Sequence, residues 1–176
     1  MRTLGKLIIW PVVFLMLVLF FLPKKSLYFE GEKLLKPQHV ILSGERAEDT
    51  GFGLTVLGGT LYYEDLEVAE LESVTVSPWL LFNRISVAPF RLSPAMKSFL
   101  PGTVDDVTVS YTVLDPLHIS VRATGGFGAL SGTVGLTDRR IRFDLTASKQ
   151  LRAMDPFWLK QFTQTKEGGY RYESTY

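Results

Sequence analysis

The chain has 176 residues, with 19 Lys or Arg against 18 Asp or Glu, so its formal net charge is +1. A balance this close to neutrality gives no reason to expect nucleic acid or a strongly acidic partner. Cysteine is absent, which excludes disulfides, thiolate metal sites and lipoprotein acylation but identifies no cellular compartment.

The most apolar stretch is Leu7–Leu22, which carries no charged side chain. Counted from Leu4, with Lys6 snorkelling to the headgroups, it offers about 28 Å of helix against a bilayer core of about 30 Å. A cleaved secretion signal would end in small residues, whereas Pro23 and two lysines follow here. We therefore predict a single transmembrane anchor. Its side chains include Leu7, Ile8, Trp10, Phe14, Leu17, Phe20 and Leu22.

The anchor divides the chain into a short tail (1–6), a collar (23–37) and one domain (38–176). Within the collar, Leu27–Lys36 is expected to form a short helix that ends before Pro37. Basic residues flank the anchor on both sides, so charge alone leaves the topology open. A very short basic tail is the common form of an uncleaved signal-anchor, and we favour a cytoplasmic tail with an exported domain.

From His39 onward, apolar and polar residues alternate with a period of two, most clearly in 107–113, 118–124 and 140–147. Alternation gives each strand one apolar and one polar side, as in antiparallel sheets with one face in water. We predict a mainly β fold, with a curved antiparallel sheet forming an open groove or rolled half-barrel and one or two short helices. The candidate apolar face comprises Val107, Val109, Tyr111, Ile119, Val121, Ile141, Phe143 and Leu145.

This apolar face has two interpretations, since it is core if other elements cover it and a trough for acyl chains or an apolar partner if they do not. Two aromatic clusters, at 79–82 and 157–159, could likewise either plug the core or form an interface. One of them follows Asp155 and Pro156, which predict the start of a helix over 157–163. The candidate interface residues are Trp79, Leu80, Phe82, Phe157 and Trp158.

No catalytic constellation is recognisable in the sequence. His39 and His118 are the only histidines and lie about eighty residues apart, so they favour solvated or structural roles over zinc binding. Ser43 and Ser131 precede glycines but lack the glycine two places earlier that a nucleophile elbow requires. We predict a protein that is not an enzyme and that binds no cofactor or metal.

Several segments together resemble the protein N family of type II secretion systems. These are the anchor running into Leu-Pro-Lys-Lys, Gly-Leu-Thr-Val at 53–56, the strand pattern of 66–81 and Gly-Gly-Tyr-Arg-Tyr-Glu at 168–173. That family is related in style to AsmA-like proteins, although this chain is shorter than its usual member. The resemblance implies a single-pass inner-membrane protein of a Gram-negative bacterium, with its domain in the periplasm and without catalytic residues.

The first functional hypothesis is an accessory component of type II secretion that binds other envelope secretion subunits through strand edges or aromatic clusters. The alternative is a lipid-binding module of the AsmA or lipopolysaccharide-bridge type, which holds acyl chains on its apolar sheet face. A general envelope structural protein is a third possibility. Dry packing of all of the following residues would remove the lipid hypothesis: Val109, Tyr111, Val121, Phe143 and Leu145.

Overall fold

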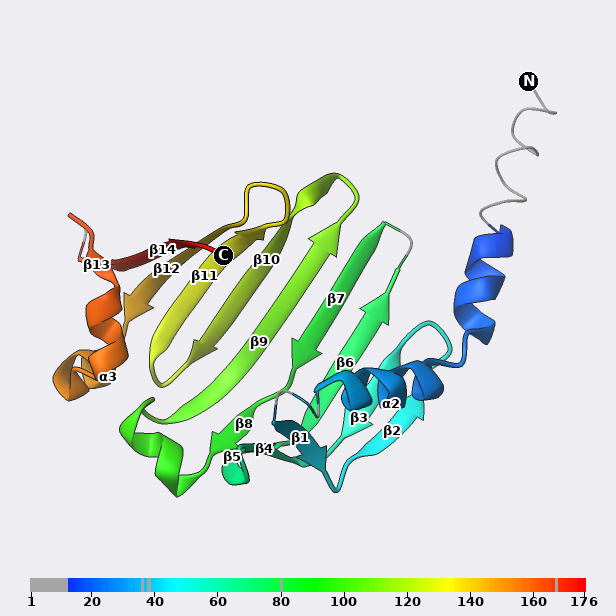
Figure 1. Cartoon of the computed structure of the whole chain (residues 1–176), viewed down its shortest axis with the longest axis horizontal. Helices are drawn as coiled ribbons and strands as arrows, with labels where there is room; N and C mark the ends of the chain where they lie inside the picture. The colour runs from blue at the N-terminus through cyan, green and yellow to red at the C-terminus, as the bar shows by residue number, and fades with distance from the viewer. Residues whose placement is uncertain (1–12, 36, 38, 80, 167) are drawn as a thin grey trace.

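The computed structural model describes residues 13–35, 37, 39–79, 81–166 and 168–176. Within this part, the chain forms one large antiparallel sheet with a few short helices, which confirms the predicted mainly β class (Figure 1). Besides a helix over residues 13–21, the helices are α2 (Lys24–Leu35) and α3 (Lys149–Met154), with 3₁₀ turns η2 (Pro94–Ser98) and η3 (Phe157–Gln161). The strands are β1 (Val40–Ser43), β2 (Arg46–Asp49), β3 (Leu54–Leu57), β4 (Thr60–Tyr63), β5 (Leu66–Leu71), β6 (Ser73–Pro78), β7 (Phe82–Val87), β8 (Phe90–Leu92), β9 (Thr103–Thr112), β10 (Asp115–Gly125), β11 (Gly128–Gly135), β12 (Arg140–Ala147), β13 (Thr163–Gln164) and β14 (Tyr170–Thr175).

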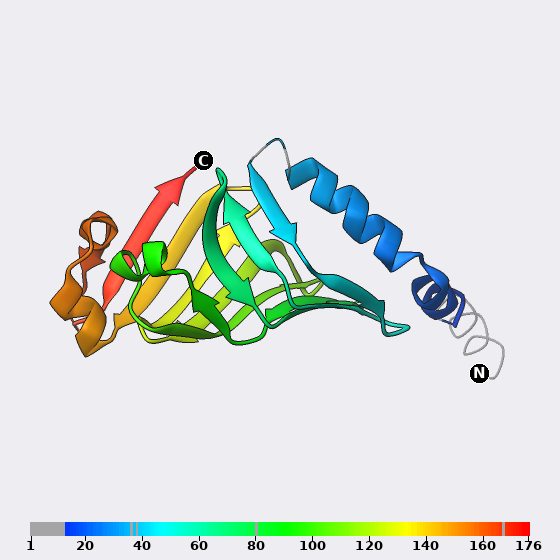
Figure 2. The ribbon, with the colours of Figure 1, turned by 90° about the horizontal axis from the view of Figure 1, so that it is seen from below.

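The sheet is an antiparallel meander whose first strands are each broken in the middle. Each of the first four passes of the chain across the sheet is divided into two strands: β1 and β2, β3 and β4, β5 and β6, and β7 and β8. Each of these strands pairs with a strand of the next pass. Strand β9 pairs with both β7 and β8. The breaks therefore align across the sheet and form a crease at which the strands bend, giving the curved sheet seen in Figure 2.

Glycines allow the bend between β3 and β4, close to the free edge of the sheet that β1 and β2 form. Gly58 and Gly59 have φ values of 67° and 114°, which residues with a side chain rarely adopt. Pairing nevertheless continues across the crease, because the Gly58 amide donates to the Glu72 carbonyl and the Leu71 amide to the Gly59 carbonyl, each at 2.8 Å. The strands thus bend without leaving their backbone groups unpaired.

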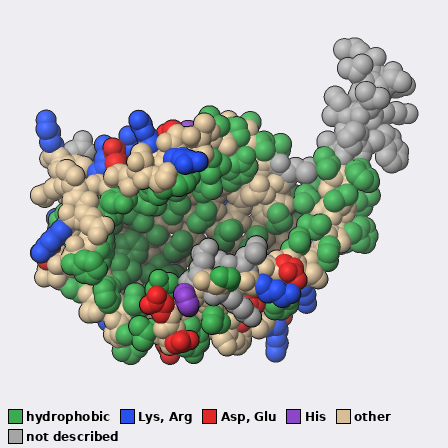
Figure 3. Space-filling model, in the orientation of Figure 1, with side chains coloured by type: hydrophobic (Ala, Val, Ile, Leu, Met, Phe, Trp, Pro, Cys, Tyr) green, Lys and Arg blue, Asp and Glu red, His purple; other side chains and the backbone are tan. Residues whose placement is uncertain are grey.

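Strand register places apolar residues on one face of the sheet, because directly paired residues share a face. The lining of what we call the apolar trough consists of two such rows, and Figure 3 shows the hydrophobic hollow that they line. The rows are Tyr172, Phe143, Gly132, Val121, Val109, Ile85, Val76 and Leu54, and then Tyr170, Leu145, Leu130, Ala123, Val107, Val87, Val74 and Val56.

The opposite face of the same strands is polar. One register row crosses it without a large apolar side chain, as expected for a face in water. It consists of Arg84, Ser110, Ser120, Thr133, Arg142 and Glu173.

A compact hydrophobic core closes one end of the trough. Helix α3 starts at Ser148, whose hydroxyl accepts from the Leu151 amide at 3.1 Å and donates to the Gly126 carbonyl at 2.7 Å. This cap ties α3 to the turn between β10 and β11, and it places Leu151, fully buried, at the centre of the cluster. The buried members are Val104, Ala123, Phe127, Leu145, Ala147, Leu151 and Leu159.

The predicted transmembrane helix is not confirmed. Residues 13–21 are helical, whereas residues 7–12 of the predicted span lie outside the described residues. In the part of the chain that is described, no helix combines the length and the apolar character needed to cross a membrane. The helix over 13–21 stops before Pro23, because proline disfavours helical geometry at the preceding Leu22.

The collar forms helix α2, which starts at Lys24, earlier than predicted, and ends at Leu35.

One local prediction was wrong, and three short elements were not predicted. The segment after Pro156 forms the 3₁₀ turn η3 instead of an α-helix, and Asp155 ends α3 at φ 41° instead of capping η3. Helix α3 itself was not predicted, because a six-residue helix shows too little periodicity. Strands β2 and β8 were also missed, since Arg-Ala-Glu-Asp has no apolar alternation and β8 has only three residues.

Candidate functional site

The apolar trough is the feature of the sheet that suits an apolar ligand. Of the predicted apolar-face residues, Leu145 is buried at 2% exposure within the core, and Val107 packs against that core. The others remain only partly buried, as the open hollow in Figure 3 illustrates. A sheet face covered by a second layer would be dry, so this face is a groove along most of its length. The partly buried residues are Val107, Val109, Tyr111, Ile119, Val121, Ile141 and Phe143.

Aromatic side chains form the wall at the closed end of the trough. The Trp158 and Phe162 rings meet edge to face at 5.9 Å, and Phe162 lies 5.4 Å from the Tyr172 ring. The Trp158 indole donates to the Phe99 carbonyl at 2.8 Å, which fixes its orientation. Trp158 therefore plugs the core, whereas its neighbour Phe157 is 65% exposed and meets the Phe99 ring edge to face at 6.0 Å.

The second predicted aromatic cluster lies elsewhere, at the hairpin between β6 and β7. Trp79 stacks on Phe52 at 5.5 Å, and Phe52 meets Phe20 of the N-terminal helix at 5.4 Å. Phe82 carries the Arg84 guanidinium 4.9 Å above its ring, while Leu80 lies outside the described residues. The structure thus does not bring the two predicted aromatic clusters together, and it attaches Trp79 to the apolar N-terminal segment.

Gly51 allows this attachment. A Cβ at this position would lie 2.8 Å from the Phe20 ring, and the backbone has φ 83°, so both space and conformation require glycine. The end of the N-terminal helix therefore packs directly on the turn between β2 and β3.

A buried lysine fixes the joint between the N-terminal helix and the sheet. Lys24, 5% exposed, donates to the carbonyls of Phe20 and Leu22 at 3.2 and 3.3 Å and pairs with Asp49 at 3.4 Å. The Gly51 amide and then Lys24 hold the pKa of Asp49 below its ordinary value. The stabilisation from Asp49 is therefore present above its unfolded-state pKa and is lost as the pH falls through the lower folded-state pKa.

Helix α2 contributes a second contact beside this joint. The Tyr28 hydroxyl donates to the Glu45 carboxylate at 3.4 Å, and burial, together with the charges of Glu45 and Glu32, raises the pKa of Tyr28 to about 12. Tyr28 therefore stays neutral at physiological pH and acts as a hydrogen-bond donor that holds α2 along the edge of the sheet.

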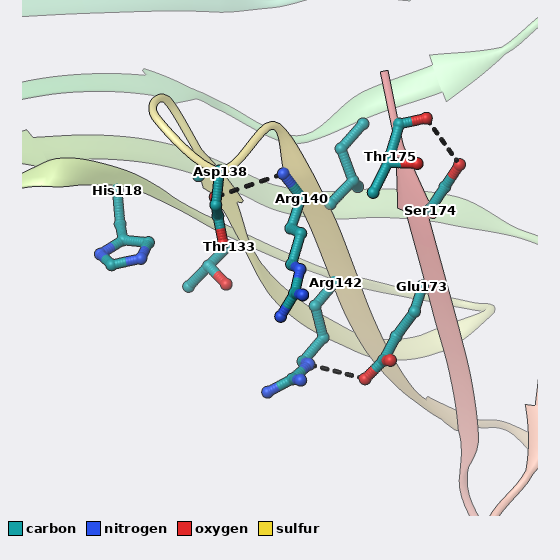
Figure 4. Close-up of a pocket in the computed structure, with 10 residues that line it drawn as sticks. His118, Thr133, Asp138, Arg140, Arg142, Glu173, Ser174 and Thr175 are labelled. Atoms are coloured by element: carbon teal, nitrogen blue, oxygen red, sulfur yellow. Dashed lines mark hydrogen bonds and ion pairs between the residues drawn. The ribbon is translucent and has the colours of Figure 1, made fainter.

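The polar face carries an open pocket of about 620 Å³ (Figure 4). Arg142 in its lining pairs with Glu173 at 2.8 Å, and His118 contacts Asp115 at 2.7 Å. The His118 contact is local and exposed, since Asp115 lies only three residues earlier in the chain. Among the described residues, no group of three or more His, Asp or Glu side chains could hold a metal ion.

Sequence reasoning missed the part of the trough that lies beyond β9. Ile85, Val76 and Leu54 continue its lining, and their strands did show period-two alternation, but only register reveals that they share a face with Val109. Phe162 and Tyr172 were likewise not identified as the closing wall. Comparisons of the chain with family models, curated proteins and solved structures found no match.

Proposed function

We propose that this protein holds lipid acyl chains along its apolar trough while anchored in a bacterial inner membrane. The observation that carries the proposal is the contrast between the two faces of one sheet. One face offers continuous rows of partly buried apolar side chains, and the other is polar along the same strands. The proposed activity is binding, without catalysis, cofactor or metal.

The chemistry of the lining favours an acyl chain over a polar ligand. Across β14 to β3, the two lining rows contain aliphatic and aromatic residues and one glycine, with no charged side chain. Each methylene that moves from water into such a surface contributes about 0.8 kcal/mol. A chain lying across several strands would therefore gain several kcal/mol without any specific polar contact.

The proposed setting follows from the N-terminal sequence. The apolar stretch Leu7–Leu22 is the proposed transmembrane anchor, with the domain in the periplasm, and the joint at Lys24 would keep the sheet close to the bilayer. The resemblance to the type II secretion protein N family and to AsmA-like proteins points in the same direction. It rests on sequence patterns alone.

Photo-crosslinking tests the proposal with two adjacent positions. Val109 and Ser110 lie on opposite faces of β9 and are both partly buried. With p-benzoylphenylalanine at Val109 in cells, we expect a phospholipid or acyl-chain adduct by mass spectrometry, because the probe faces the trough. The same probe at Ser110 should give none. Equal yields at both positions, or no adduct at Val109, would refute acyl-chain binding.

A second candidate function is the accessory role in protein export, favoured by the free edge of β14. Strand β13 pairs only with Tyr170 and Arg171, so within the described residues no strand pairs with the outer edge of β14 beyond them. Such an edge can accept a strand from a secretion subunit. Loss of secretion on gene deletion, with outer-membrane lipids unchanged, would favour this role over lipid binding.

A further inference from the structure

The meander brings exposed apolar side chains to one edge of the sheet. Alternate turns of a meander lie on the same edge, so the turns after β2, β6, β9 and β11 are neighbours (Figure 1). The C-terminal residue joins them, because the Tyr176 amide donates to the Arg139 carbonyl. We call the exposed apolar residues of this edge the hairpin rim: Leu81, Val113, Leu114, Leu117, Leu136 and Tyr176.

The exposure of these side chains is unusual for a sheet edge in water. Leu114 at the tip of the β9–β10 hairpin is 89% exposed, and Leu81 at the β6–β7 hairpin is 66% exposed. Hairpin tips normally carry polar turn residues. Several large apolar side chains on neighbouring tips therefore indicate a surface that meets an apolar phase.

The N-terminal helix identifies that phase. Residues 13–21 leave the sheet at this same edge, through the contacts of Phe20 with Phe52 and of Phe52 with Trp79. The apolar run of which they form part continues towards the N-terminus, outside the described residues. The joint at Lys24 and Asp49 holds this helix to the sheet. An apolar segment and an apolar rim thus point to the same side of the molecule.

The opposite edge has a different character. Its β4–β5 turn consists of Glu64 and Asp65, both at positive φ, and Phe127 in the β10–β11 turn is buried in the core. Leu66, Phe99 and Phe157 are exposed at this edge. The core cluster also closes the trough at that edge. The N-terminal helix at the rim and the core cluster at the opposite edge together orient the trough, with its closed end away from the rim.

We propose that the hairpin rim lies in the headgroup–acyl boundary of the bilayer, so that the trough stands on the membrane with its closed end outward. The inference rests on the membrane anchoring proposed above and is independent of whether the trough holds lipid. Tyr176 and Trp79 suit this position, because aromatic residues with one polar atom favour membrane–water interfaces. The proposed partner of the hairpin rim is the lipid surface itself.

Spin labels test the proposal, since the chain has no cysteine and any introduced thiol is unique. The variants are Leu114→Cys in the rim and Leu66→Cys, which is 65% exposed beside the β4–β5 turn on the opposite edge. The full chain is reconstituted in phosphatidylethanolamine and phosphatidylglycerol vesicles. Collisions of each label with oxygen and with an aqueous nickel complex are then measured.

We expect the label at position 114 to lie about 5–10 Å inside the boundary and the label at position 66 to lie in water. Equal access of the nickel complex to both labels would overturn the proposal. Shielding of position 114 from both reagents would also overturn it, because that pattern marks a protein contact such as a second copy. A lipid adduct at Val109 in either case would leave acyl-chain binding standing while the rim proposal fails.

Discussion

Leu151→Ala is expected to destabilise the protein by about 3–5 kcal/mol, the upper part of the range for leucine truncation in cores. Leu151 lies at the centre of the hydrophobic core cluster, and 0% of its surface is accessible to solvent. Removing its side chain leaves a cavity between α3 and the ends of β10 and β12, where Ala123 and Ala147 are too small to fill it.

The measurement is chemical denaturation followed by circular dichroism, with Leu114→Ala as the matched control. The same atoms are removed at position 114, but that side chain is 89% exposed, so the control should stay within about 0.5 kcal/mol of the parent. If both variants were equally stable, α3 would not be part of the cooperative core. The trough would then lack a fixed closed end.

Gly132→Val is expected to destabilise the sheet by about 2–3 kcal/mol, because it overpacks a tight site. Gly132 pairs with Phe143 on β12, and a Cβ at this position would collide with the Phe143 ring and with the Arg142 carbonyl. The ring lies over the glycine and fills the gap in the lining row. Valine would push Phe143 into the trough, so bound acyl chains should decrease as well.

Ser131→Val provides the control, since Ser131 is the preceding residue of β11 and lies exposed on the polar face. Valine favours strands, so this variant should be as stable as the parent or slightly more stable in thermal unfolding. Unchanged stability in Gly132→Val would mean that Phe143 can move freely. In that case the lining of the trough would not be fixed by packing.

The sheet could be predicted from sequence because its signal is local. Val121 and its neighbours alternate with Ser120 and Arg122, and this alternation assigns them to a strand with one apolar face. Whether that face is covered depends on where other elements lie, which alternation does not encode. Core and trough are therefore both compatible with the sequence, and the partial burial of Val121 is a property of the assembled fold.

The crease and the rim depend on register, and this explains why they were not predicted. Two adjacent glycines such as Gly58 and Gly59 are compatible with the end of a strand, but the aligned breaks in neighbouring strands emerge only when the strands pair. In the sequence, Leu114 lies between the predicted strands 107–113 and 118–124. Its meaning changes once the meander places it on the same edge of the sheet as Leu81 and the N-terminal helix. The crease and the rim therefore depend on long-range strand pairing, which the local sequence pattern does not reveal.

Thiol protection tests most directly the claim that the apolar face is an open groove for acyl chains. Val121→Cys places a single thiol in the trough, and Ser120→Cys places one on the polar face of the same strand. In delipidated protein, both thiols should react with an aqueous maleimide. Added oleate should slow the reaction at position 121 and leave position 120 unchanged. A thiol at position 121 that never reacts would reveal a closed core, and one that reacts equally with and without oleate would contradict acyl-chain binding.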